Sequence, residues 1–422
     1  MVDMNAASRR NSHSHDNTDL SPRQVGLILF ALTLGGFAIG TGEFASMGLM
    51  PNMVASLGVT EPQVGHLISA YALGVVIGAP LLAILGAGWK RKTLLLSLMG
   101  FYALGNLASA LGPTYASLLL FRFIAGLPHG AYFGVAALTA VAISPPNRRG
   151  RAVSLVMLGL TLAILIGNPL ATWVGQVIEW RWIYAAVAVI AVTTVVLLGV
   201  WLPAHIDGPK KKPLAELRAF NRLPVWQALG IGAIGFAGMF SVFSYLAPTM
   251  LEVTGVSAAW IPLGLVGFGI GGVVGNFVGG WLYDHYKLRG AGAVLIWATV
   301  ALLLFPLMAQ SLPTILVATI AIGLMGALGP ILQSHLMDVA GDAQTLAAAS
   351  HHAAFNTANA LGPWLGGMAI TAGFGWTSTG YVGAATAVVG LMIYAWALRT
   401  QQATAGAKTA ADEDDVAACE AG

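Results

Sequence analysis

The sequence predicts an all-α membrane protein with twelve transmembrane helices, arranged as two pseudo-symmetric bundles of six. Of the 422 residues, 57% are apolar and only 9% are charged, whereas charged residues make up about 25% of an ordinary soluble domain. Long apolar runs recur along the chain, and about 20 apolar residues are needed to cross the hydrocarbon core of a bilayer. This composition excludes a cytosolic enzyme, a disordered protein and a nucleic-acid binder.

Twelve apolar runs are long enough to span a membrane. In chain order, we expect helices over Val25–Leu49, Val64–Leu85, Thr93–Leu111, Tyr115–Ile143, Ala152–Val177, Trp182–Leu202, Val225–Leu251, Ala258–Tyr283, Ala291–Ala309, Pro313–Met337, Thr345–Ala372 and Thr377–Leu398. The predicted organisation is a disordered cytoplasmic tail (1–23), a six-helix bundle (24–202), a cytoplasmic linker (203–224), a second bundle (225–398) and a disordered cytoplasmic tail (399–422). The only cysteine, Cys419, excludes an intramolecular disulfide.

The positive charges fall almost entirely on one side of these predicted spans. Of the 20 Lys and Arg residues, 18 lie in the tails, the central linker or the loops after spans 2, 4 and 8. Arg181 lies on the other side and Arg122 inside span 4. Cytoplasmic loops carry an excess of Lys and Arg, so we expect both termini and the linker to be cytoplasmic. The polar residues 1–23 have no apolar core and are not a secretory signal.

The two halves of the sequence resemble each other. Gly74–Gly78 in span 2 corresponds to Gly271–Gly275 in span 8, with an offset of 197 residues. Gly167–Pro169 in span 5 corresponds to Leu361–Pro363 in span 11, with an offset of 194. Parallel six-span repeats are typical of transporters whose halves rock around a site at the midplane. A chance likeness between glycine-rich helices is the alternative explanation.

Four motifs carry a resemblance to a known family. They are Gly40-Thr41-Gly42-Glu43-Phe44 with Met47-Gly48-Leu49-Met50-Pro51 in span 1, Arg122-Phe123-Ile124-Ala125-Gly126 with Gly130 in span 4, Gly362-Pro363-Trp364-Leu365-Gly366-Gly367 in span 11, and Gly280-Trp281-Leu282-Tyr283-Asp284 with Lys287 and Arg289 after span 8. With these motifs the chain resembles the major facilitator superfamily. Within it, the chain is similar to the twelve-span drug:proton antiporter branch and to bacterial arabinose-efflux-permease-like transporters, which implies the bacterial cytoplasmic (inner) membrane.

The resemblance assigns conformational roles to several residues and also has gaps. The residues that match conformational motifs are Gly126, Gly167, Pro169, Gly280, Asp284, Gly362, Pro363, Gly366 and Gly367. The span-5 copy of the antiporter motif is degenerate. The loop after span 2 keeps the basic cluster Lys90–Lys92, but the aspartate that the family usually has there is missing. In the family that acid is part of a charge lock for the outward-open state, so the lock in the first half is in doubt.

Glu43, Arg122 and His129 are the candidate proton-coupling residues. Glu43 is the only one of the 17 acids that we place deep inside a span, and a charge at the bilayer centre costs about 2.5–3.5 kcal/mol. It is a proton carrier, a substrate-binding acid or a member of a structural ion pair. Arg122 pairs with Glu43 or with backbone carbonyls. His129 either relays a proton or is a neutral buried side chain that donates one hydrogen bond.

Polar and aromatic residues inside the spans are the candidate substrate contacts. Together with Glu43 they are Tyr71, Phe133, Phe240, Tyr245, His352, Asn356 and Asn359. Helical spacing puts Arg122, Gly126, His129 and Phe133 on one face of span 4. Hydrogen bonding between helices and plain packing are the alternatives for these side chains.

The sequence predicts a carrier and no enzyme. It has no phosphate-binding Gly-x4-Gly-Lys-Ser/Thr loop and no spaced His/Cys set for a metal, so we expect no cofactor. The expected energy source is the proton gradient, in which each charge gains about 2.3 kcal/mol per 100 mV. We expect a monomeric proton-coupled antiporter that exports a small neutral or cationic organic compound, such as a drug or sugar, by alternating access. A proton-coupled importer and a non-transporting membrane sensor are the alternatives.

Overall fold

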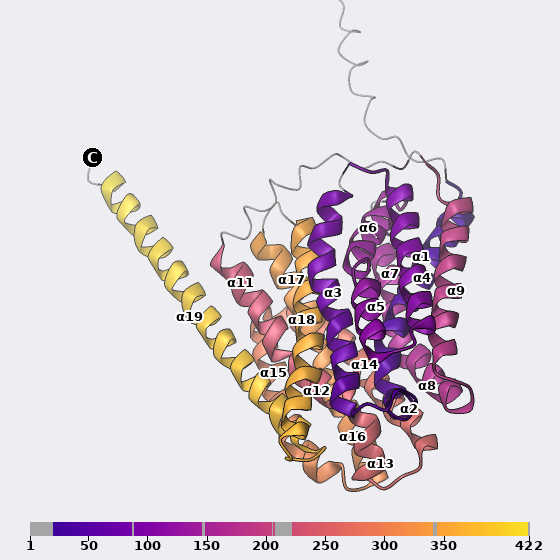
Figure 1. Ribbon diagram of the computed structural model, residues 1–422. Helices are drawn as coiled ribbons and strands as arrows, with labels where there is room; N and C mark the ends of the chain where they lie inside the picture. Colours follow the sequence, from indigo (N-terminus) through magenta and orange to yellow (C-terminus); the bar gives the residue numbers. More distant parts are fainter. Residues whose placement is uncertain are drawn as a thin grey trace, which may run out of the picture.

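The computed structural model describes residues 20–86, 88–145, 148–204, 206, 222–340 and 344–420, which contain helices and no strands. The first half comprises α1 (Pro22–Gly48), α2 (Met50–Leu57), α3 (Glu61–Leu85), α4 (Arg91–Leu111), α5 (Tyr115–Gly126), α6 (His129–Ala142), α7 (Arg149–Leu162), η2 (Ala163–Gly167), α8 (Asn168–Val177) and α9 (Arg181–Trp201). The second comprises α11 (Leu223–Gly230), η4 (Ile231–Gly235), α12 (Ala237–Ser244), α13 (Leu246–Glu252), η5 (Ala258–Trp260), α14 (Ile261–Tyr286), α15 (Arg289–Met308), α16 (Leu312–Gly323), η6 (Leu324–Ala327), α17 (Leu328–Ala340), α18 (Gln344–Thr371) and α19 (Ser378–Glu420). Successive spans run up and down beside one another (Figure 1).

Local sequence signals set where several helices begin and end. Ser21, Thr60 and Thr114 form capping boxes at the starts of α1, α3 and α5, which satisfy backbone N–H groups that the first turn leaves unpaired. The short helices α2 and α13 are followed by Gly58 and Gly255, whose φ angles are 64° and 70°. Glycine adopts this left-handed conformation without steric cost, so both helices stop where the chain turns into the next span.

Counted by length and composition, the helices that can span a membrane are one fewer than the twelve that the sequence predicts. Within the described residues, 11 helices are long and apolar enough to cross a membrane. The remaining predicted span corresponds to α18, which is 28 residues long but has polar side chains along it. Those of His351, Asn356 and Asn359 are buried within the protein, where neighbouring helices shield them from lipid. The multi-pass helical fold is confirmed, and the count of twelve stays a prediction.

Two predicted spans are broken in the middle. Span 4 is divided into α5 and α6 around Leu127 and Pro128, since proline has no N–H to donate in a helix. Span 5 contains the π-helical turn η2 between α7 and α8, a feature that is frequent at functional sites. The break in span 4 lies beside α3, where a methyl group added at Gly78 would lie 2.5 Å from Cα of Leu127. The π-helical turn in span 5 lies beside α1, as the contact of Gly167 with Phe37 shows.

Glycines allow equivalent helices to approach closely in both halves. A methyl group added at Gly74 on α3 would lie 3.3 Å from Cα of Gly126 on α5. One added at Gly271 on α14 would lie 2.9 Å from Cα of Gly323 on α16. The same offset of 197 residues relates both members of the two pairs. The internal repeat of the sequence therefore corresponds to a repeated helix contact.

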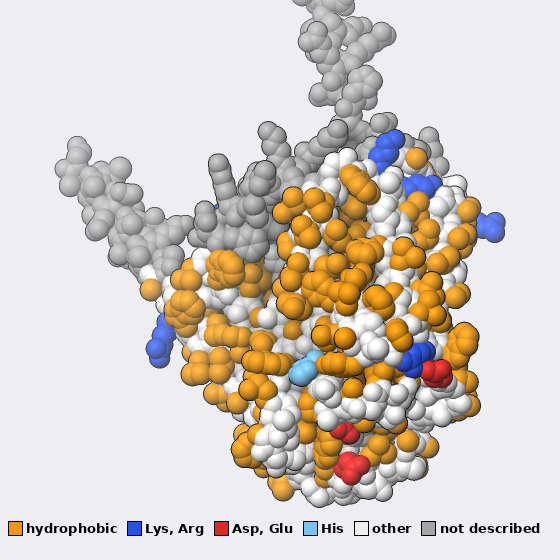
Figure 2. All heavy atoms as spheres, in the orientation of Figure 1, with side chains coloured by type: hydrophobic (Ala, Val, Ile, Leu, Met, Phe, Trp, Pro, Cys, Tyr) orange, Lys and Arg blue, Asp and Glu red, His pale blue; other side chains and the backbone are white. Residues whose placement is uncertain are grey.

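Basic residues mark one end of the bundle. They flank the ends of α3, α4, α7, α11, α14 and α15 on one side, which we call the basic end, and comprise Lys90, Arg91, Lys92, Arg148, Arg149, Arg151, Arg222, Lys287 and Arg289. In Figure 2, hydrophobic side chains cover most of the described surface between the two ends of the bundle. The acidic side chains seen in this view lie in its lower half. This pattern suits a protein surrounded by lipid.

The two halves contact each other through their central helices. Ser69 on α3 donates a hydrogen bond of 2.8 Å to the carbonyl oxygen of Ala360 on α18. Gln176 on α8 donates one of 2.8 Å to the carbonyl oxygen of Ala258 on η5. Gln176 and Ala258 lie at the end of the bundle opposite the basic end, so the halves are joined there.

The predicted tails and linker fall partly outside the described residues. This applies to residues 1–19 of the N-terminal tail, to 205 and 207–221 of the linker and to 421–422. In contrast, α19 continues past the predicted membrane boundary at Leu398 to Glu420, where the sequence predicts a disordered tail. Alanine has the highest helix propensity and recurs throughout residues 399–420, which accounts for the helical backbone there.

Candidate functional site

Glu43 lies on α1 at the contact between the two halves, and its side chain is only 4% exposed. One carboxylate oxygen, Oε1, accepts a hydrogen bond of 2.7 Å from Nδ2 of Asn359 on α18. The other, Oε2, lies 3.8 Å from Nδ1 of His129 on α6. The single buried acid of span 1 thus faces the second half with one oxygen and the first half with the other.

Arg122 on α5 lies beside Glu43 without a contact to its carboxylate. Its Nη2 donates to the backbone carbonyl oxygen of Glu43 over 3.5 Å. The guanidinium lies over the rings of Tyr71 and Tyr184, at 4.4 and 5.0 Å from the ring centroids. Its Nε and Nη1 atoms are buried without a hydrogen-bond partner among the described residues. Of the two pairings expected for Arg122, the structure has the one with a backbone carbonyl.

His129 connects Glu43 to a tyrosine of the first half. Its Nδ1 lies 3.1 Å from the hydroxyl group of Tyr71 and 3.8 Å from Oε2 of Glu43. The first distance is a hydrogen bond in either tautomer, whereas the second is too long for one. A proton can pass between Glu43 and His129 only after a side-chain movement or through a bridging water.

An aromatic contact between the halves adjoins the Glu43 cluster. The rings of Phe133 on α6 and His352 on α18 are stacked, with 5.5 Å between centroids and 8° between planes. Phe133 also contacts His129 at 5.3 Å. On the other side, His351 packs against Phe355 at 4.5 Å. A row of aromatic and imidazole rings therefore extends from the acid towards the second half.

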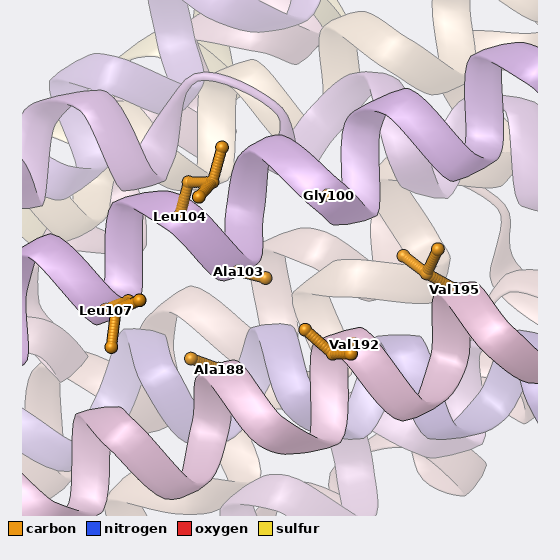
Figure 3. A pocket seen from close by; sticks show the side chains of 7 residues that line it. All are labelled: Gly100, Ala103, Leu104, Leu107, Ala188, Val192 and Val195. Carbon is orange, nitrogen blue, oxygen red and sulfur yellow. The ribbon is translucent and has the colours of Figure 1, made fainter.

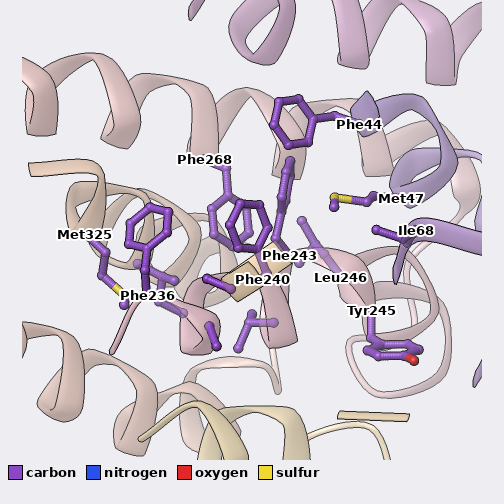
Figure 4. Close-up of a cluster of buried hydrophobic side chains, with 14 of the residues drawn as sticks. Phe44, Met47, Ile68, Phe236, Phe240, Phe243, Tyr245, Leu246, Phe268 and Met325 are labelled. Atoms are coloured by element: carbon purple, nitrogen blue, oxygen red, sulfur yellow. The ribbon is translucent and has the colours of Figure 1, made fainter. Parts of the chain in front are cut away.

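Phe240 belongs to a second group of rings, mostly from the second half (Figure 4). It stacks on Phe44 of α1 at 6.4 Å and meets Phe236 edge-on at 5.5 Å. Phe236 in turn lies 4.4 Å from Phe355. Phe44 directly follows Glu43 in the chain, and these contacts link its ring to Phe355 of α18. Phe240 and Glu43 therefore lie in neighbouring parts of the same interface.

Tyr245 lies away from this group. In Figure 4 its ring points away from Phe240 and Phe243. Its hydroxyl group donates a hydrogen bond of 2.8 Å to the carbonyl oxygen of Pro363, within the predicted antiporter motif. A methyl group added at Gly367 of the same motif would lie 3.3 Å from Cβ of Pro62, at the start of α3. Tyr245 therefore supports the packing of the motif at the end opposite the basic end.

Several buried polar atoms near the interface have no protein partner within the described residues. Asn356 donates to the carbonyl oxygen of His352, but the Oδ1 atoms of Asn356 and Asn359 accept no hydrogen bond. An unpartnered buried acceptor costs about 1–3 kcal/mol. These two acceptors can bind hydroxyl or N–H groups of a ligand or water.

The predicted motif residues have different surroundings. Gly126 and Gly362 allow close helix contacts, with Gly362 packed on the backbone of α12. Gly366 faces Ser241 of α12, and Gly167 and Pro169 are buried in and after η2. A methyl group at Gly280 would touch nothing within 4 Å. Asp284 is exposed, and the neighbouring Tyr283 instead donates a hydrogen bond to the carboxylate of Asp338 on α17.

Tyr184 and Tyr102 belong to this cluster but are not among the predicted site residues. Tyr184 lies under the Arg122 guanidinium, and its hydroxyl group is 2.5 Å from that of Ser46. Tyr102 donates to backbone carbonyls of α1. The spacing of Tyr102 and Asn106 on one helix face is a signal that could have found that pair, whereas nothing in the sequence marks Tyr184. Within the described residues, no group of three or more His, Cys, Asp or Glu residues can hold a metal.

Comparisons with known proteins agree with this architecture. A family model described as Major Facilitator Superfamily matches residues 32–294 and 229–418. The inner membrane transport protein YdhP of Escherichia coli K12 is 35% identical over 377 residues, covering 89% of this chain and 97% of that protein. A chloramphenicol resistance protein of Streptomyces lividans is 32% identical over 350 residues, covering 80% and 87%.

A solved structure has the same fold. The crystal structure of a bacterial homolog of the human lysosomal transporter Spinster, inward-facing and unoccupied, matches with a TM-score of 0.72 over 90% of this chain and 98% of that chain. The two sequences are 17% identical, so this likeness concerns the fold alone.

Proposed function

The chain belongs to the major facilitator superfamily, and we propose that this transporter is a proton-coupled antiporter that exports small organic compounds across the bacterial cytoplasmic membrane. In this proposal both termini are cytoplasmic, and the six-helix bundles 24–202 and 225–398 rock around the Glu43 cluster. The protein works as a monomer and draws its energy from the proton gradient. Export is favoured because a relative over most of the chain is named a chloramphenicol resistance protein.

The position of the Glu43 carboxylate carries this proposal. Its Oε1 accepts from Asn359 of the second half, while its Oε2 faces His129 of the first half. Protonation of a carboxylate turns one oxygen from an acceptor into a donor. Proton binding therefore changes a contact between the halves, and a proton taken up from one side can favour the opposite orientation.

The surroundings of Glu43 suggest which ligands compete with the proton. Phe133, His352 and Phe355 supply ring faces on which a ligand can stack, and the Oδ1 atoms of Asn356 and Asn359 have no hydrogen-bond partner among the described residues. An aromatic or otherwise apolar compound with hydroxyl or N–H donors, neutral or cationic, matches these groups. Chloramphenicol, which has an aromatic ring and hydroxyl groups, is the first probe that we suggest.

The proposal is tested in proteoliposomes with an acidic interior and a pH-sensitive dye. Chloramphenicol, lipophilic cations, pentoses and nucleosides are added in turn outside, and proton release from the lumen is recorded. We expect at least one compound to release protons from the wild type and not from Glu43→Gln. Glu252→Gln is the matched control, since it removes an exposed carboxyl at the end of α13.

Three outcomes of these assays would contradict parts of the proposal. Equal proton release by wild type and Glu43→Gln contradicts the role of Glu43. Substrate uptake that never moves protons, measured with radiolabelled compound, contradicts proton coupling altogether. Substrate and protons that move in the same direction would replace the antiporter with an importer.

A further inference from the structure

A lateral groove between α4 and α9 is separate from the Glu43 cluster. It encloses a cavity of about 310 Å³ and is lined by Gly100, Ala103, Leu104, Leu107, Ala188, Val192 and Val195 (Figure 3). Leu104 and Val192 are 66% and 51% exposed, so the groove opens on the outer surface of the bundle. Its lining has no charged side chain, which suits an occupant from the hydrocarbon region.

A lysine joins the two helices at the basic end of this groove. The ammonium group of Lys92 on α4 donates a hydrogen bond of 2.6 Å to the carbonyl oxygen of Gly199 on α9. An ammonium group has three donors, so two remain for another ligand. Lys90 and Arg91 precede it, in the loop where the family usually has an aspartate. Lys92 thus contacts a carbonyl rather than a carboxylate.

The groove begins within the lipid leaflet on the side of Lys92 and extends to about the middle of the bilayer. A helix rises 1.5 Å per residue, so Gly100 lies about 12 Å and Leu107 about 22 Å along α4 from Lys92. The hydrocarbon core of a bilayer is about 30 Å thick, about 15 Å per leaflet. A phosphate group at Lys92 therefore places an attached acyl chain at the depth of the groove.

We propose that this groove binds an anionic phospholipid, with one acyl chain between α4 and α9 and its phosphate at Lys92. The acyl chain fills the groove and gains van der Waals contacts with its apolar lining. A second copy of the protein fits less well. A two-fold axis along the membrane normal would place both positively charged Lys92 residues at the same depth of one interface, where like charges repel each other.

The test is native mass spectrometry of the full chain in detergent, titrated with phosphatidylglycerol or phosphatidylcholine carrying the same acyl chains. A basic residue near an anionic membrane surface contributes about 1 kcal/mol, so we expect Lys92→Gln to weaken phosphatidylglycerol binding roughly fivefold. The glutamine still has an N–H for Gly199, and Lys92→Arg, which keeps the charge, should retain the preference.

A second pair of variants tests the groove. A methyl group at Gly100 touches nothing within 4 Å, so Gly100→Leu can extend into the cavity without a backbone clash. We expect Gly100→Leu to lose binding of both lipids severalfold and Gly100→Ala to retain it. Equal binding of the two lipids by the wild type, or unchanged binding in both Lys92→Gln and Gly100→Leu, contradicts the proposal. A dimer that Gly100→Leu dissociates would identify a second copy as the occupant.

Discussion

The two halves of this transporter share a backbone arrangement but differ in the chemistry that they place on it. The offset of 197 residues that relates Gly74 to Gly271 also relates Pro51 to Pro248 and Gly58 to Gly255. Gly58 and Gly255 have nearly the same positive φ angle. In spans 2 and 4 and in the segment after span 1, the repeat therefore extends to single residues.

At four equivalent positions the first half has ionisable side chains and the second half has none. The pairs at this offset are Glu43 and Phe240, Tyr71 and Phe268, Arg122 and Thr319, and His129 and Gly326. Thr319 is buried and its hydroxyl group donates to Leu316 of its own helix. The second half contributes aromatic rings and the neutral Asn359 to the same interface.

The difference shows how one fold can separate two tasks. In our proposal the first half binds the proton, and the second half responds through Asn359 and supplies apolar surface for the substrate. Ionisable groups at the equivalent positions of the second half would bury further charges beside Glu43 and Arg122, and each charge costs about 2.5–3.5 kcal/mol at the bilayer centre.

The largest effect is expected when the acid moves to the other half. In the double variant Glu43→Phe with Phe240→Glu, the new carboxyl lies near Phe44 and Phe236 and lacks the contacts with Asn359 and His129. We expect substrate-driven proton release to fall at least about a hundredfold, the lower range for a positioned proton-transfer group. Dye-loaded proteoliposomes measure it, and size-exclusion chromatography checks folding. Release near the wild-type rate would mean that the two halves are interchangeable.

Arg122 is the next residue to exchange for its counterpart. Arg122→Thr removes the guanidinium, and Arg122→Lys keeps a charge but loses the planar stacking on Tyr71 and Tyr184. A desolvated cation–π contact contributes about 2 kcal/mol, so we expect transport to drop about tenfold or more in both variants. The control Thr319→Ala should stay within twofold in the same uptake assay. Full activity of Arg122→Lys would reduce the role of Arg122 to its charge.

Much of this arrangement could be predicted from the sequence. Apolar runs and the distribution of Lys and Arg located the helices, and the repeat at Gly74 and Gly271 indicated two similar halves. The rarity of Glu43 and Arg122 inside apolar spans marked both residues, because a buried charge needs a partner. Helical spacing also placed His129 and Phe133 on the face that meets Glu43.

What the sequence could not give was the partner of each side chain across helices. Glu43 contacts Asn359, which is more than 300 residues away in the chain, and Arg122 lies between two tyrosines instead of beside the carboxylate. Tyr245 was expected at the substrate, but its hydroxyl group binds Pro363. Such pairings depend on rotation of helices about their axes, which hydropathy does not encode. The helical backbone of residues 399–420 reflects local alanine propensity, which the polar composition concealed.

Substitutions at the glycine contacts test whether close helix packing contributes equally to the stability of both halves. Gly126→Leu and Gly323→Leu each force a side chain against the backbone of the neighbouring helix. Overpacking typically costs about 1–3 kcal/mol, so we expect similar losses of thermal stability, measured by tryptophan fluorescence in detergent. Gly280→Ala, with open space at its Cβ, is the control and should not lower the midpoint. A loss confined to one half would show that the repeat is not mechanically equivalent.

The smallest effect is expected at the neutral partner from the second half. Asn359→Ala removes the 2.7 Å hydrogen bond to Oε1 of Glu43 but leaves the acid, His129 and Arg122 in place. A hydrogen bond typically contributes about 0.5–1.5 kcal/mol, so we expect proton release to change about threefold to tenfold. Asn359→Gln, which has the same amide on a longer side chain, should restore part of it. If Asn359→Ala abolished coupling as completely as Glu43→Gln, the second half would be an equal partner in proton binding, and the division of tasks between the halves would fail.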